Sequence, residues 1–213
     1  MLFPRTAFLW TFLCVSLLAH AHAQPFSDDA RYTAAYAQYQ AATEGNKRAT
    51  RQAVELFTAL HEAYPNDPVA MVLLGSSQAM QGRDAFLPWN KLNHTETGLD
   101  TMERAQGLIT ADHSTHTFAK LPVSVMVPLF AAITYVEVPD FFGRFEQGYD
   151  MLQQVSRHPD LARVHPEGRT VIHYYTALAA QRVEDRSTQQ QALEALYALN
   201  LNDEFTQLAR QRF

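Results

Sequence analysis

The chain has 213 residues, 47% of them hydrophobic, and a formal net charge of −5 at pH 7. Basic residues never occur more than two in a row, as at Lys47 and Arg48. Binding to a phosphate backbone requires a clustered basic surface, so the sequence excludes a nucleic-acid-binding protein. Glycine is sparse, at 8 residues, and helical periodicity dominates, so we expect an all-α protein.

The first 23 residues have the pattern of an export signal. Arg5 provides a weakly basic start, and residues 7–19 are almost wholly apolar. Ala21 and Ala23 then supply the small-x-small pattern that signal peptidase accepts, which makes Gln24 the first residue of the mature chain. An uncleaved membrane anchor is the alternative, but about 13 apolar residues are too few to cross roughly 30 Å of hydrocarbon comfortably.

The expected organisation is a cleaved signal peptide, 1–23, followed by one domain, 24–213, in the periplasm or outside the cell. Cys14, the one cysteine, lies inside the signal. The mature chain is therefore expected to contain no disulfide and no thiolate, so its core must hold it together and thiol catalysis is excluded. No later segment is long and apolar enough to span a membrane.

Apolar residues at helical spacing, together with turn residues, divide the rest of the chain into helices. The predicted helices cover 27–43, 48–64, 68–80, 95–109, 122–138, 145–155, about 166–180, 187–200 and 203–212.

Several of these boundaries depend on single residues. Gly82 is expected to end the third helix, and 84–94 is expected to be irregular. Pro128 is expected to kink or restart the fifth helix, because an interior proline costs about 3 kcal/mol. Ser187 and Gln190 have the spacing of a capping box and would start the eighth helix. The last helix is short and polar enough to shield the end of an apolar array.

A small residue followed four positions later by a large apolar one recurs three times. Such a pair allows two helices to approach closely, and a period near 45–50 residues is typical of stacked helix pairs. The sequence therefore predicts an α-solenoid of antiparallel helix pairs with about eight or nine helices. The three pairs are Ala53 and Phe57, Gly98 and Met102, and Gly148 and Leu152.

The first of these pairs resembles the tetratricopeptide repeat family. That family carries Leu-Gly in its first helix, Ala-x3-Phe in its second and a proline eight residues later. Ala53, Phe57 and Pro65 have these types and spacings, and Leu74-Gly75 lies where the next repeat would carry its pair. The next small residue then falls at Gly98, which implies an insertion of 11 residues.

The tryptophan-containing insertion, 86–92, and the segment 139–144 together look like a divergent group of exported bacterial proteins with degenerate repeats of this family. The resemblance covers roughly residues 45–160. It implies a TPR-like helical scaffold that binds a peptide or protein on its concave face, and it carries over no catalytic residue.

The most prominent candidate binding residues are aromatic side chains of these two segments and the arginines beside them. Phe and Trp above a groove would form an anchor pocket, and the two arginines could clamp a carboxylate. Alternatively, the tryptophan fills a gap by packing on the phenylalanine pair of the next repeat, and we favour this second interpretation. The residues are Arg83, Phe86, Trp89, Phe141, Phe142 and Arg144.

No catalytic, phosphate-binding or dinucleotide motif is present, so the sequence predicts neither an enzyme nor a cofactor. His113 and His116 could place two imidazoles on one helical face, but further metal ligands are not evident. We therefore expect a non-enzymatic, exported scaffold for a protein or peptide partner, such as an accessory protein of an envelope complex or transporter. The alternative is a small-ligand or metal-binding periplasmic protein that uses 86–89 or the two histidines.

Overall fold

A computed structural model describes residues 29–213, which form an all-α fold. The expected export signal lies outside the described residues. The described helices are α1 (Ala30–Thr43), α2 (Lys47–Ala63), α3 (Pro68–Asp84), α4 (Pro88–Gln106), α5 (Val123–Glu137), α6 (Phe145–Ser156), α7 (Pro166–Arg182), α8 (Arg186–Ala198) and α9 (Glu204–Arg212).

Short elements fill three of the connections. A two-stranded antiparallel hairpin, β1 (Thr117–Phe118) and β2 (Leu121–Pro122), follows the 3₁₀-helix Ala111–Ser114 and leads into α5. The 3₁₀-helix Asp140–Phe142 joins α5 to α6, and the 3₁₀-helix Pro159–Arg163 joins α6 to α7. No helix within residues 29–213 combines the length and the apolar character needed to cross a bilayer.

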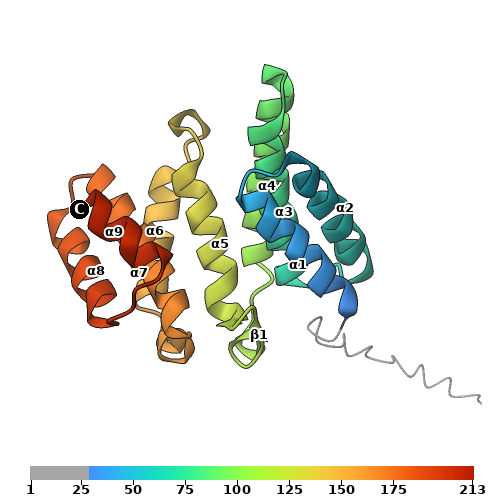
Figure 1. The fold of residues 1–213 in the computed structure, drawn as a ribbon. Coiled ribbons are helices and arrows are strands. Elements are labelled where there is room, and N and C mark those ends of the chain that lie inside the picture. The colour runs from blue at the N-terminus through green and yellow to red at the C-terminus, as the bar shows by residue number, and fades with distance from the viewer. Residues whose placement is uncertain (1–28) are drawn as a thin grey trace, which may run out of the picture.

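Successive helices pair and stack, as the sequence predicted. Each helix from α1 to α8 contacts the next one along the chain, and α1, α3, α5 and α7 also contact one another in sequence. The odd-numbered helices therefore form one layer and the even-numbered helices α2, α4, α6 and α8 form the other. Figure 1 shows the pairs following one another across the molecule, with α9 placed against α7 and α8.

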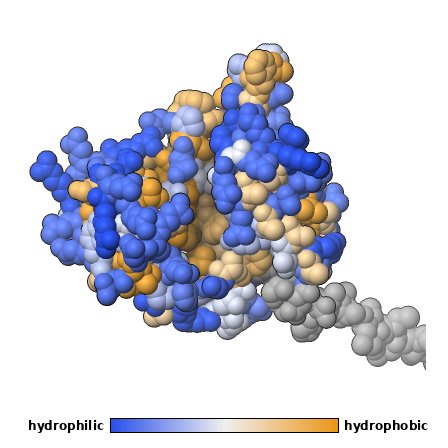
Figure 2. Space-filling view, viewed as in Figure 1, coloured by the Kyte–Doolittle hydropathy of each residue, from blue (hydrophilic) through white to orange (hydrophobic). Residues whose placement is uncertain are grey.

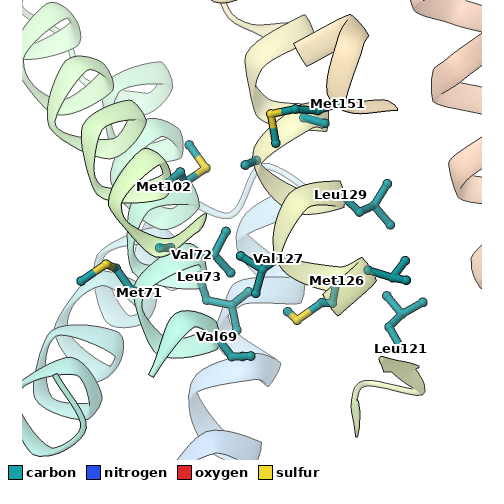
Figure 3. Close-up of a cluster of buried hydrophobic side chains, with 14 of the residues drawn as sticks. Val69, Met71, Val72, Leu73, Met102, Leu121, Met126, Val127, Leu129 and Met151 are labelled. Atoms are coloured by element: carbon teal, nitrogen blue, oxygen red, sulfur yellow. The ribbon is translucent and has the colours of Figure 1, made fainter. Parts of the chain in front are cut away.

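The centre of the core lies between α3 and α5. Nearly every residue in the first half of α3 is buried, and α5 is apolar around most of its circumference. Figure 3 shows Val69, Val72 and Leu73 of α3 opposite Met126 and Val127 of α5. A helix that is hydrophobic all round must be covered on more than one side, which places α3 and α5 in the middle of the array.

Glycines set the distance between α3 and α4. A Cβ on Gly75 would lie 2.7 Å from the carbonyl oxygen of Gly98, and one on Gly98 would collide with the carbonyl oxygen of Gly75. Gly82 faces the backbone of Lys91 and Thr95 in the same way. The two helix backbones therefore touch directly at both levels, which confirms the close approach predicted from the small residue at 98.

Hydroxyl groups connect neighbouring pairs through the aspartates that cap the helices. The Tyr32 hydroxyl donates to Asp67, the N-cap of α3, at 2.6 Å, and the Tyr149 hydroxyl donates to Asp185, the N-cap of α8, at 2.8 Å. The same arrangement joins Thr170 to Asp203 at the start of α9, and a similar bond within the first pair joins Tyr64 at the end of α2 to Asp29 at the start of α1. Donor and acceptor are 33–36 residues apart in the sequence.

The α3–α4 hairpin is longer than the sequence predicted. Gly82 does not end α3: it permits close contact with Lys91 and Thr95 of α4, and the helix continues to Asp84. The stretch 84–94 is mostly helical, since α4 begins at Pro88, where the missing N–H of proline is not needed. The insertion therefore extends both helices of the hairpin and does not form a separate loop.

Two other boundaries also differ from the prediction. Helix α5 does not restart at Pro128 but continues through it, because it is packed against α3, α6 and α7, and this burial outweighs one lost backbone hydrogen bond. The alternative, a kink at Pro128, stays a prediction. Helix α8 starts before Ser187, so the predicted capping box is wrong. Asp185 is the N-cap, and its Oδ1 accepts the backbone N–H of Thr188 at 3.0 Å.

The glycine contact predicts a large effect of a single methyl group. Gly98→Ala should lower the free energy of unfolding by about 1–3 kcal/mol, because the Cβ has no space beside α3. Gly107→Ala, at the end of the same helix, is the matched control and should change it by at most about 1 kcal/mol. Chemical denaturation of the two variants provides the measurement, and equal effects would contradict the contact.

The cap of α3 predicts a dependence of stability on pH. Burial raises the pKa of Asp67 from its ordinary 3.8 to about 6, although hydrogen bonds from Tyr32 and two backbone N–H groups lower it. The folded state therefore binds a proton on Asp67 more tightly than the unfolded state does. As the pH falls from about 7 to 4, protonation of Asp67 increases the free energy of unfolding.

Asp67→Asn removes this titration and keeps a residue suited to the cap. The free energy of unfolding of the wild type, relative to Asp67→Asn, should rise by about 1–3 kcal/mol between pH 7 and pH 4. Urea denaturation at several pH values measures the difference. Parallel pH profiles for the two proteins would contradict the raised pKa.

Candidate binding groove

A large groove runs along the inner layer of helices. Its volume is about 1140 Å³, and its lining comes from α1, α3, α5, α7 and α9, the first turns of α4, and the β1–β2 hairpin. No residue of the outer helices α2, α6 or α8 contributes. Figure 2 shows this apolar hollow between the two halves of the molecule.

Aromatic side chains form the side of the groove that belongs to α1 and α5. The rings of Tyr36 and Tyr39 stack with 5.8 Å between centroids, and Phe130 lies 5.8 Å from Tyr39. The Tyr39 hydroxyl is 3.0 Å from Ser76 Oγ, and burial raises the pKa of Tyr39. These contacts hold the rings in place before any ligand arrives.

The other side of the groove combines apolar residues with one central carboxylate. Ile133 and Glu137 follow Phe130 along α5, and Tyr175 of α7 lies near Glu137. Burial and the Glu137 carboxylate both raise the pKa of Tyr175, which therefore stays a neutral hydrogen-bond donor. Glu137 is exposed to solvent and makes no ion pair within residues 29–213.

The aromatic residues predicted to bind lie at two projecting tips on either side of one end of the groove. Phe86 and Trp89 lie at the tip of the α3–α4 hairpin, where they are 91% and 62% exposed. Phe141, which is 70% exposed, lies with its ring centroid 4.3 Å from that of Phe142 in the α5–α6 connection, and the two rings are tilted by 35°. The interpretation that we favoured, packing of Trp89 in a gap, is wrong, because the lengthened hairpin carries this side chain beyond the next pair.

The two arginines do not form a clamp, because each is engaged within the fold. Arg83 pairs with Asp84 at 2.9 Å and donates to the backbone carbonyl of Ala42 at the end of α1. Arg144 pairs with Asp100 at 3.2 Å and with Glu103 at 3.0 Å on α4. Arg83 contributes to the groove, whereas Arg144 joins α6 to α4 away from it.

The two histidines of the alternative proposal lie in and beside the 3₁₀-helix that precedes β1. Nδ1 of His113 accepts the backbone N–H of Thr110 at 2.9 Å, and Nδ1 of His116 lies 3.0 Å from the carbonyl oxygen of Asp112. Burial, followed by the charge of His116, lowers the pKa of His113. Within residues 29–213, no three His, Cys, Asp or Glu side chains are placed to hold a metal ion.

Four residues that line the middle of the groove were not singled out from the sequence, namely Tyr36, Tyr39, Phe130 and Ile133. The sequence of α5 contains a signal for Phe130 and Ile133, because the helix carries more apolar residues than one buried face requires. The surplus on its second face lines the groove.

Comparison with protein-family models, with curated proteins and with solved structures found no match to the chain.

Exposure of the tips predicts that they contribute little to stability. Phe86→Ala should change the free energy of unfolding by less than about 0.5 kcal/mol, since the side chain is 91% exposed. Phe57→Ala, the same substitution at a fully buried position of α2, should cost about 3–5 kcal/mol. Thermal or urea denaturation separates the two outcomes, and a large loss for Phe86→Ala would show that the tip is packed.

Proposed function

We propose that this protein is a non-enzymatic, exported helical scaffold whose inner groove binds an apolar segment of a protein partner. The observation that carries the proposal is the convergence of all the inner helices on one groove, with no contribution from α2, α6 or α8. A stack of helix pairs that presents one continuous concave surface is the usual binding architecture of solenoid proteins. Export rests on the pattern of residues 1–23.

The size of the groove favours a peptide segment over a compact metabolite. Small-molecule sites usually enclose about 300–1,000 Å³ and cover most of their ligand, whereas this groove holds about 1140 Å³ and reaches from the hairpin tip to β2. An amphipathic helix that places its apolar face in a groove suits such a shape. The TPR-like identity of the scaffold is part of the same proposal.

Glu137 indicates that the partner segment carries a positive charge. Its exposed side chain lines the groove together with Tyr175, Ile133 and Val138, and it makes no ion pair within residues 29–213. A Lys or Arg on an otherwise apolar segment would pair with it on binding. Such a pair, partly removed from water, contributes to specificity as well as to affinity.

The proposal is tested by site-specific crosslinking. A photoreactive residue in place of Gln40 of α1 or Ile133 of α5, which both line the groove, should crosslink to the same partner in an envelope fraction. The matched control is the same residue in place of Glu55, an exposed position on the outer helix α2, which should give no such product.

The crosslinked partner segment, made as a peptide, should then bind with a negative heat-capacity change in calorimetry, because apolar surface is buried. Ile133→Lys and Glu137→Gln should each weaken binding about tenfold or more, while Glu55→Gln should have no effect. Equal crosslinking from the inner and outer positions, or a tightly bound small apolar molecule in native mass spectra, would argue against a peptide groove.

A further inference from the structure

Two exposed apolar tips project from the same end of the molecule. One is the α3–α4 hairpin tip with Phe86, Leu87 and Trp89, and the other is the α5–α6 connection with Phe141 and Phe142. Figure 1 shows both connections at the upper end, and Figure 2 shows hydrophobic surface on each. Among the large exposed hydrophobic side chains of residues 29–213, the three most exposed are Phe86, Phe141 and Trp89.

Within the two tip segments, 83–92 and 138–144, each acidic residue is paired with an arginine, whereas Glu137, which precedes the second segment, is not. Asp84 is the one acidic residue in 83–92, and it pairs with Arg83 and accepts the hydroxyl of Thr50. Asp140 is the one acidic residue in 138–144, and it pairs with Arg182. Lys91 of the first tip is exposed, donates to the carbonyl oxygen of Arg83 at 3.2 Å and makes no ion pair within residues 29–213, so no carboxylate neutralises its charge.

The shape of the end of the molecule that carries the two tips fits a lipid bilayer better than a folded protein partner. The tips are convex and lie on opposite sides of the groove, whose lining includes Pro88 and Leu92 from one side and Phe141 and Phe142 from the other. A rigid protein would have to match two separate projections at once. A bilayer interface accommodates each of them, and it favours Trp and Phe beside a Lys whose ammonium group reaches the lipid phosphates.

We propose that the two tips are a membrane-surface anchor, which inserts Phe86, Trp89 and Phe141 into the interfacial region of an anionic bilayer without spanning it. Lys91 supplies the electrostatic attraction. Bound in this way, the molecule would hold one end of its groove against the membrane surface. The inference does not depend on the identity of the groove's occupant.

Trp89 provides a direct probe. The chain from Gln24 onward contains every helix of the fold, and Trp89 is its one tryptophan, because the other, Trp10, precedes it. On addition of vesicles of phosphatidylethanolamine and phosphatidylglycerol, its emission should shift to shorter wavelength. Lipids brominated near the headgroup should quench it more than lipids brominated deep in the acyl chain, and the protein should co-sediment with the vesicles.

Substitutions distinguish membrane binding by the tips from nonspecific adsorption of the protein to vesicles. Phe86→Ser and Phe141→Ser should each lower the vesicle partition coefficient about tenfold, because each removes one buried aromatic ring. Lys91→Gln should weaken binding to phosphatidylglycerol vesicles more than to neutral phosphatidylcholine vesicles. Tyr197→Ser, at another exposed aromatic residue, is the matched control and should change nothing.

The proposal is overturned by absence of vesicle binding, by unchanged Trp89 emission in the presence of vesicles, or by equal effects of the tip and Tyr197 substitutions. It is also overturned if Phe86→Ser abolishes binding to an identified protein while vesicles leave Trp89 unaffected, since the tip would then be a protein-docking site. The groove experiment uses different positions, Gln40 and Ile133, so the failure of one proposal leaves the other standing.

Discussion

The direct contact between the backbones of α3 and α4 at Gly75 and Gly98 is the constraint on which the architecture depends. Because no side chain separates the two helices there, the antiparallel helices approach each other closely at this level. Gly82 extends the contact toward the tip. The hairpin is therefore stiff enough to carry Phe86 and Trp89 beyond the body, and its inner helix supplies the part of the groove between α1 and α5.

The helical class, the stacking of pairs and most helix ends could be predicted from the sequence, because apolar spacing and turn residues are local signals. The start of α3 at Pro68 is one example, and the turn at 139–143 is another. The hairpin could not be predicted in the same way. Gly82 ends a helix in some contexts and permits close contact in others, and only the position of α4 decides between them.

The candidate site was predicted in part. The segments 86–89 and 139–142 do adjoin the groove, but their exposure depends on helix length, which periodicity left uncertain. Arg144 could not be excluded from a binding role by its local sequence, since its partners Asp100 and Glu103 lie on another helix pair. Tyr39 has two roles, because its ring lines the groove and its hydroxyl forms a hydrogen bond with Ser76. The spacing of apolar residues in the sequence does not reveal which of these roles a tyrosine has.

The hydroxyl–aspartate bonds have a consequence for how the array comes apart. A linear stack of repeats behaves as a chain of units, each with its own stability and a coupling to its neighbour. Tyr32–Asp67, Tyr149–Asp185 and Thr170–Asp203 each place a polar bond across the boundary between units, at the residue that starts the next helix. Loss of one helix pair therefore leaves the capping aspartate of its neighbour in place but without its hydroxyl donor, so each bond adds about 0.5–1.5 kcal/mol to the coupling between neighbouring pairs.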